Sequence, residues 1–125
     1  MKALKIFSAV ALSAGLIASA NAAVDANKIT KRATVSYTCQ GGKHLNVNYG
    51  FNAAGVPVTA TARIDGQNRV MRYDLNRSDR VETSFKDARG YTLSGNEINS
   101  RNYRKAGVMV TSPRNQVVFK SCAAN

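Results

Sequence analysis

Residues 34–51 decide the fold of this chain, and they read Thr-Val-Ser-Tyr-Thr-Cys-Gln-Gly-Gly-Lys-His-Leu-Asn-Val-Asn-Tyr-Gly-Phe. Apolar side chains occupy alternate positions on both sides of a glycine pair. These positions are Val35, Tyr37 and Cys39 before the pair, and Leu45, Val47, Tyr49 and Phe51 after it. Alternation of β-branched and aromatic residues with period two is typical of strands. Two strands joined by a turn at Gly41-Gly42 are therefore predicted.

The same alternation continues along the rest of the chain. Asp65-Gly66 is a strong hairpin signal, and Ser94-Gly95-Asn96 is expected to close a short strand. The further strands are predicted at Val56–Ile64, around Met71, Tyr73 and Leu75, around Val81, Thr83 and Phe85, and at Tyr91–Leu93, Tyr103–Thr111 and Gln116–Cys122. No segment has a helical stripe. About eight short, evenly spaced strands predict an all-β fold, an antiparallel barrel or a sandwich.

The first 22 residues have the composition of an export signal. Lys2 and Lys5 precede the apolar run Ile6–Ala20, and Ala20-Asn21-Ala22 has the small-x-small pattern of a cleavage site. We therefore expect a cleaved signal peptide at 1–22, a flexible N-terminal arm at 23–33 and one β-domain at 34–125. Export excludes cytoplasmic nucleotides and chromosomal DNA as natural partners, and it predicts the periplasm or the outer-membrane surface as the location.

The exported chain is small and strongly basic. Cleavage leaves 103 of the 125 residues and lowers the formal net charge from +11 to +9. Its two cysteines, Cys39 and Cys122, are expected to form a disulfide in an oxidising compartment. This bridge would join the first strand to the last, and a closed loop of that length is worth about 4–5 kcal/mol in chain entropy.

Candidate catalytic groups are few. His44 is the single histidine and adjoins the glycine turn, where a solvated side chain is expected. The seven acidic residues are scattered, and Asp79 and Glu82 do not form a convincing acid–base pair. With the cysteines in a bridge, the chain offers poor material for a metal site or a Cys–His pair. No enzymatic activity, metal or cofactor is predicted.

Basic residues form two clusters along the sequence. One contains Arg63, Arg69, Arg72, Arg77 and Arg80, and the other contains Arg101, Arg104 and Lys105 together with Tyr103. Two interpretations remain open: a generally basic surface, or an electrostatic footprint for an acidic partner. Outside the cytoplasm such partners include lipopolysaccharide, phospholipid heads, glycosaminoglycans and carboxylate-lined clefts. Export argues against nucleic acid.

Several segments carry a resemblance to a known family. They are Tyr37-Thr38-Cys39-Gln40, Val47-Asn48-Tyr49-Gly50-Phe51, Arg80-Val81-Glu82-Thr83, Tyr103-Arg104-Lys105 and Asn115–Cys122. From about Thr34 to Cys122 the chain resembles the adhesin complex proteins of Neisseria and related bacteria, which are similar in turn to the membrane-bound inhibitors of C-type lysozyme. The resemblance implies a closed eight-stranded antiparallel β-barrel with a disulfide between the first and last strands.

The resemblance also implies two loops that enter the lysozyme cleft. In the inhibitor family one loop carries a lysine after an aromatic residue, and Tyr103-Arg104-Lys105-Ala106 matches it with Tyr for Trp and Ala for Gly. Lys105 is the foremost candidate, with Tyr103 and Arg104 beside it. The second loop carries a serine. The segment Ser78–Phe85 occupies that region without the family's glycine, and the candidates are Ser78, Arg80 and Ser84.

The function implied is an exported inhibitor of host C-type lysozyme that also serves as an adhesin. The alternative is a surface adhesin for anionic host or envelope glycans without inhibition. C-type lysozymes are typically basic, so two basic proteins would repel at long range and affinity would depend on local fit in the acidic cleft. The resemblance also implies that two copies associate as a homodimer.

Overall fold

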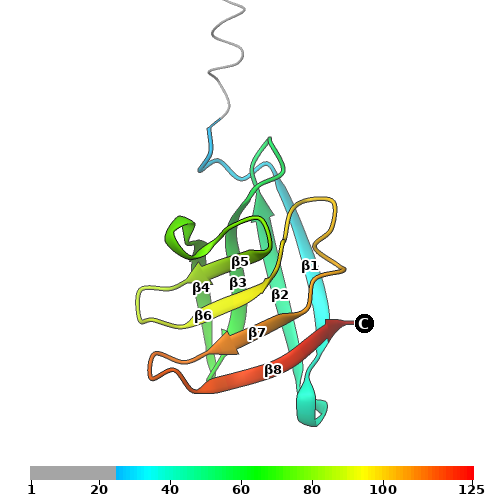
Figure 1. The fold of residues 1–125 in the computed structure, drawn as a ribbon, viewed down its shortest axis with the longest axis vertical. Coiled ribbons are helices and arrows are strands. Elements are labelled where there is room, and N and C mark those ends of the chain that lie inside the picture. Colours follow the sequence, from blue (N-terminus) through cyan, green and yellow to red (C-terminus); the bar gives the residue numbers. More distant parts are fainter. Residues whose placement is uncertain (1–24) are drawn as a thin grey trace, which may run out of the picture.

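The computed structural model describes residues 25–125, and the expected signal peptide at 1–22 lies outside the described residues. Eight strands follow one another around a closed antiparallel barrel (Figure 1). They are β1 Lys31–Thr38, β2 His44–Phe51, β3 Pro57–Ile64, β4 Gln67–Tyr73, β5 Glu82–Lys86, β6 Thr92–Asn96, β7 Val108–Thr111 and β8 Val117–Ala124. Short 3₁₀ turns occupy Gln40–Gly42 (η1) and Leu75–Arg77 (η2). No helix among these residues is long and apolar enough to cross a membrane.

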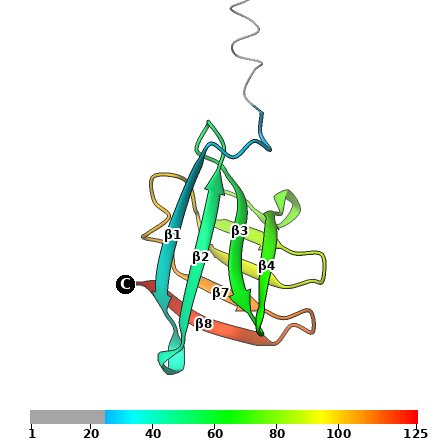
Figure 2. The same cartoon turned by 180° about the vertical axis from the view of Figure 1, so that it is seen from behind.

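The predicted eight-stranded barrel is confirmed, and its strands form two crossing layers. In Figure 1 strands β5 to β8 pass in front of β1 to β4, and Figure 2 shows the reverse side, with β1 to β4 nearest the viewer. Side chains that point inward from both layers fill the space between them. The largest of these fully buried residues are Tyr37, Tyr49, Phe51, Phe85, Ile64, Met71 and Leu93. The alternation quoted from residues 34–51 is therefore the inward face of β1 and β2.

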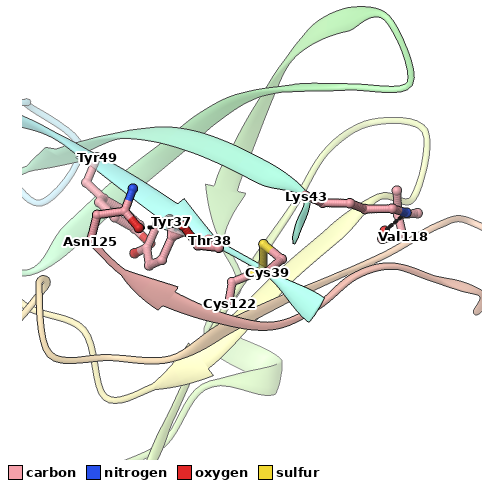
Figure 3. Close-up of a disulfide and its surroundings, with 8 residues drawn as sticks. All are labelled: Tyr37, Thr38, Cys39, Lys43, Tyr49, Val118, Cys122 and Asn125. Carbon is pink, nitrogen blue, oxygen red and sulfur yellow. Dashed lines mark hydrogen bonds between the residues drawn. A yellow bond between two sulfur atoms is a disulfide. The ribbon is translucent and has the colours of Figure 1, made fainter. Parts of the chain in front are cut away.

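The predicted disulfide is confirmed between Cys39 and Cys122 (Figure 3). It joins the end of β1 to β8 at the point where the barrel closes. The ladder there is short, since only Tyr37 and Thr38 of β1 are paired with residues of β8. A hydrogen bond between the Thr38 and Asn125 side chains lies on the same seam. The covalent bridge thus reinforces the least extensively paired junction of β1.

The first strand begins inside the segment expected to be a flexible arm. Lys31 pairs with Phe51 and Ala33 with Tyr49, so β1 starts before Thr34. The backbone N–H of Thr30 donates to the Phe51 carbonyl, and a Cβ on Gly50 would lie 2.7 Å from Ile29 Cδ1. The alternation of Lys31, Ala33 and Val35 already carried this signal. Residues from Ile29 onward therefore lie against the barrel.

Other boundaries also differ from the expectations. Leu75 is 76% exposed, because the Asp74 carboxylate caps η2 and turns the chain away from the core, and Val81 is 72% exposed in the turn whose N–H groups bond Asp79. The strand expected over Tyr103–Thr111 begins only at Val108, and the residues before it belong to a loop. The segment expected as a turn at Ser94–Asn96 continues β6, paired with β5 and β7.

Two tyrosines share a hydrogen bond inside the barrel. Because both are buried, we expect the folded protein to lose stability in alkali. Tyr37 Oη and Tyr49 Oη lie 2.6 Å apart, and burial raises the pKa of both. The unfolded chain ionises its tyrosines near pH 10, while the folded chain holds these two neutral to a higher pH. Stability is therefore complete below pH 10 and falls above it, by at most about 1.4 kcal/mol per pH unit for each tyrosine.

Urea unfolding at pH 8 and at pH 11 measures this loss. The double variant Tyr37→Phe, Tyr49→Phe should lose less stability between the two pH values than the wild type, because phenylalanine does not ionise. Equal losses in the two proteins would contradict the assignment.

Candidate functional site

Three connections gather at one end of the barrel because antiparallel strands alternate in direction. They join β2 to β3 (52–56), β4 to β5 (74–81) and β6 to β7 (97–107), and they lie in the upper half of Figure 1. The β4–β5 and β6–β7 connections are the two loops expected to form the site. The topology thus brings Ser78 and Arg80 to the same end as Tyr103, Arg104 and Lys105.

The β6–β7 loop is held by its own asparagines. Asn99 Oδ1 accepts hydrogen bonds from the N–H groups of Arg101 and Asn102, and Asn102 Oδ1 accepts one from the Asn99 N–H. The Lys105 N–H donates to the Asn102 carbonyl at 2.8 Å. These side-chain bonds to the backbone replace a strand ladder and fix the loop.

The same loop is tied to the barrel on both sides. At its start, the Ile98 side chain is buried and the Ile98 N–H donates to Thr83 Oγ1 at 2.9 Å. The Ser100 N–H donates to the Gly55 carbonyl of the β2–β3 turn. At its end, Ala106 is buried. The loop therefore has few conformations to lose when a partner binds it.

Tyr103 anchors the exposed cations. Its half-buried ring lies 5.6 Å from the Phe51 ring, centroid to centroid, and joins the edge of the core. The Lys31 ammonium lies 5.6 Å from the same ring, and the Arg104 guanidinium 5.9 Å. Arg104 and Lys105 are exposed. The aromatic ring thus packs against its own barrel with Lys31 and Arg104 beside it, and Lys105 follows Arg104 as an exposed cation.

Lys31 is a site residue that sequence reasoning missed. It falls in the segment 23–33 expected to be a flexible arm, yet its ammonium also lies 3.4 Å from the Ser100 carbonyl oxygen, to which it donates. The period-two alternation that extends β1 back to Lys31 is the signal that could have placed it there.

The second expected loop is arranged differently. Ser78 is half-buried, and its hydroxyl accepts from the Ser84 N–H at 2.9 Å and faces the Ser84 carbonyl at 3.4 Å. Ser84 lies in β5 and is only 2% exposed, so it does not stand on the loop. The Asp79 carboxylate accepts the N–H groups of Val81 and Glu82 and leaves Arg80 exposed. Of these three candidates, only Arg80 presents a largely exposed side chain at the loop end.

One arginine of the first basic cluster is a structural residue, which corrects the expected surface cluster. Arg69 is buried, with Nε donating to the Ile64 carbonyl and its guanidinium stacked 3.8 Å from the centre of the Tyr91 ring. It lies 3.8 Å from Asp87, while Tyr91 donates to Asp65. That hydrogen bond raises the pKa of Tyr91. The side chains of Arg69, Tyr91, Asp87 and Asp65 together join the β3–β4 and β5–β6 turns.

The remaining cations have few acidic partners. Within residues 25–125 the Arg69–Asp87 pair is the one ion pair within 4 Å. Most aspartates are engaged by turns, since Asp25, Asp74, Asp79 and Asp87 accept backbone N–H groups. Arg72 and Lys86 face each other as cross-strand partners of β4 and β5, and both are exposed. The surface is thus left with uncompensated positive charge.

Comparisons with known proteins agree with the fold and with the expected family. Residues 33–124 match the family model described as an ACP-like domain. The solved structure of the Adhesin Complex Protein from Neisseria meningitidis is similar, with 43% sequence identity and a TM-score of 0.70. The similarity covers 74% of this chain and 99% of that one. No curated protein matches the sequence.

Proposed function

This chain belongs to the family of ACP-like domains, and from that premise we propose that it is an exported, adhesin-like protein that inhibits C-type lysozyme. The observation that carries the proposal is the anchored β6–β7 loop. Tyr103 packs on Phe51 and leaves Arg104 and Lys105 exposed at the end of the barrel. Such a loop supplies binding groups and needs no catalytic residue. The periplasm or the outer surface is the compartment in which the protein would meet lysozyme.

The chemistry of inhibition follows from the target. Lysozyme hydrolyses glycosides with two carboxyl groups in a cleft, one of which must hold a proton. The Lys105 ammonium placed between them donates charge-assisted hydrogen bonds to both. A nearby cation also lowers the pKa of the catalytic acid and so favours its ionised, inactive form. Arg104 and Arg80, exposed at the same end of the barrel, are our candidates for binding carboxylates at the rim of the cleft.

Inhibition of cell lysis tests this proposal. The exported protein, added to lysozyme at several-fold molar excess, should slow the clearing of a Gram-positive cell suspension by about tenfold or more. Because both proteins are basic, their association rate should rise with added salt as the repulsion is screened. Unchanged lysis at this excess would sink the proposal.

A second candidate function is adhesion to anionic glycans of the host or the envelope without lysozyme inhibition. The observation that favours it is the scarcity of ion pairs around Arg72, Lys86 and the other exposed cations. Binding of this kind would weaken as salt rises, which is the opposite of the response expected for lysozyme. A homodimer is compatible with either function and would display two copies of each surface.

A further inference from the structure

The outer face of β5, β6 and β7, turned toward the viewer in Figure 1, is hollowed into a groove. Two adjoining depressions of about 490 and 350 Å³ share Glu82, Ser94 and Met109 as lining residues. One depression reaches Val81 and Gly107 next to the loop end, and the other reaches Asn115 in the β7–β8 turn. The groove therefore crosses the sheet; it meets the β6–β7 loop at Gly107, and Lys105 is not among its lining residues.

Small residues make the floor of this groove. Gly95 and Gly107 line it without adding a side chain. Ser84 and Ser94 face each other across β5 and β6, and Thr92 and Thr111 across β6 and β7. The η2 turn forms one wall with Asn76 and Arg77. A long polymer segment can lie on such a floor without displacing side chains.

The lining is chemically suited to a sugar chain. Directly opposed residues in a sheet hold their Cβ atoms about 5 Å apart, so the serine and threonine pairs present closely spaced hydroxyls. The bonds between Ser84 and Ser78 use the Ser84 backbone, which leaves the buried Ser84 hydroxyl to line the groove. Met109 and Val81 add apolar surface for the C–H face of a sugar ring.

The charges beside the groove select acidic sugars. Arg77 lines it directly. Lys86 is the cross-strand partner of Thr92, which also lines the groove, and Arg72 is the next partner in the same row. Like charges directly opposite each other destabilise a sheet, and an anionic group bound between them would remove that cost. The single acidic lining residue, Glu82, lies where the two depressions meet.

We propose that this groove binds an extended acidic oligosaccharide, with the carboxylate or sulfate groups of the sugar held by Arg72, Lys86 and Arg77. The proposal rests on the second candidate function, adhesion to anionic glycans, and gives that function its place on the molecule. It does not involve Lys105.

A sulfated tetrasaccharide from heparin, titrated into the exported protein by calorimetry, tests the site. Ser94→Phe fills the floor without changing the charge and should weaken binding by about tenfold or more. Arg72→Gln combined with Lys86→Gln should weaken it similarly. The matched control, Arg32→Gln with Arg63→Gln, also removes two charges but on β1 and β3, and should cost about twofold at most through the general field.

The outcomes separate the site from the function. If the wild type does not bind the tetrasaccharide, the adhesion candidate and this inference fail together. If it binds and the groove variants match the control, the inference alone is overturned. Equal binding of neutral chitotetraose would overturn the assignment of the cations. Sedimentation that shows a dimer broken by Ser94→Phe would mean that a second copy occupies the groove. Lysozyme inhibition by Ser94→Phe should remain unchanged.

Discussion

Replacing Cys39 and Cys122 with alanine should lower the free energy of unfolding by about 4–5 kcal/mol. The two cysteines are 83 residues apart in the sequence, so the unfolded chain regains the freedom of a very large loop when the bridge is absent. The folded state also loses its main brace at the β1–β8 junction, where two residue pairs are the whole ladder. A loss of this size is a large part of the total stability of a domain of about 100 residues.

Urea unfolding of the double variant measures the effect, and a melting temperature lower by about 20 °C or more is the thermal counterpart. Reduction of the wild type by a dithiol is the matched comparison and should give a similar loss, since both treatments open the same loop. A difference below about 1 kcal/mol between bridged and unbridged proteins would show that the barrel closes without the disulfide.

Replacing Lys105 with alanine should weaken lysozyme inhibition by about a hundredfold. Truncating one partner of a buried, hydrogen-bonded charge pair costs about 2–5 kcal/mol, largely because the other charges stay desolvated. Here those charges are the two carboxyl groups of the lysozyme cleft. The folded state should be unaffected, because the exposed Lys105 is tied into its loop through its backbone N–H and not through its ammonium.

Lys43→Ala is the control for this variant. Lys43 is also an exposed lysine, but it follows η1 at the opposite end of the barrel, where its ammonium donates to the Val118 carbonyl. Inhibition constants from the lysis assay should therefore differ strongly between the two variants. Equal weakening would mean that general positive charge, and not the β6–β7 loop, carries the inhibition.

The barrel was predictable from sequence where side-chain burial controls the conformation. Val35, Tyr37, Val47 and Tyr49 alternate because each strand buries one face, and the inward face was identified correctly. The prediction failed where a local hydrogen bond competes with burial. Asp74 caps η2 and exposes Leu75 despite its apolar side chain.

The candidate site was predictable only in part, again because hydrogen bonds compete with the sequence pattern. The position of the Tyr103–Lys105 segment followed from a family motif, but its loop conformation depends on Asn99 and Asn102, which bond each other's backbone. Arg69 was assigned to the surface because its partners, Asp87 and Tyr91, come from a turn that is distant in sequence. The groove depends on three strands meeting side by side, which no single segment reveals.

The position of the disulfide has a mechanical consequence. A pulling force applied between the two chain ends enters at the N-terminal side of β1 and leaves through Ala123–Asn125. The covalent link between Cys39 and Cys122 transmits that force directly and shields every residue between them. Only the residues before Cys39 and after Cys122 could be extended, while the backbone of the β6–β7 loop and of the outer groove, which lies between the two cysteines, would carry no tension. A protein that holds a cell to a surface in flow would thus keep the load off the backbone of its binding faces.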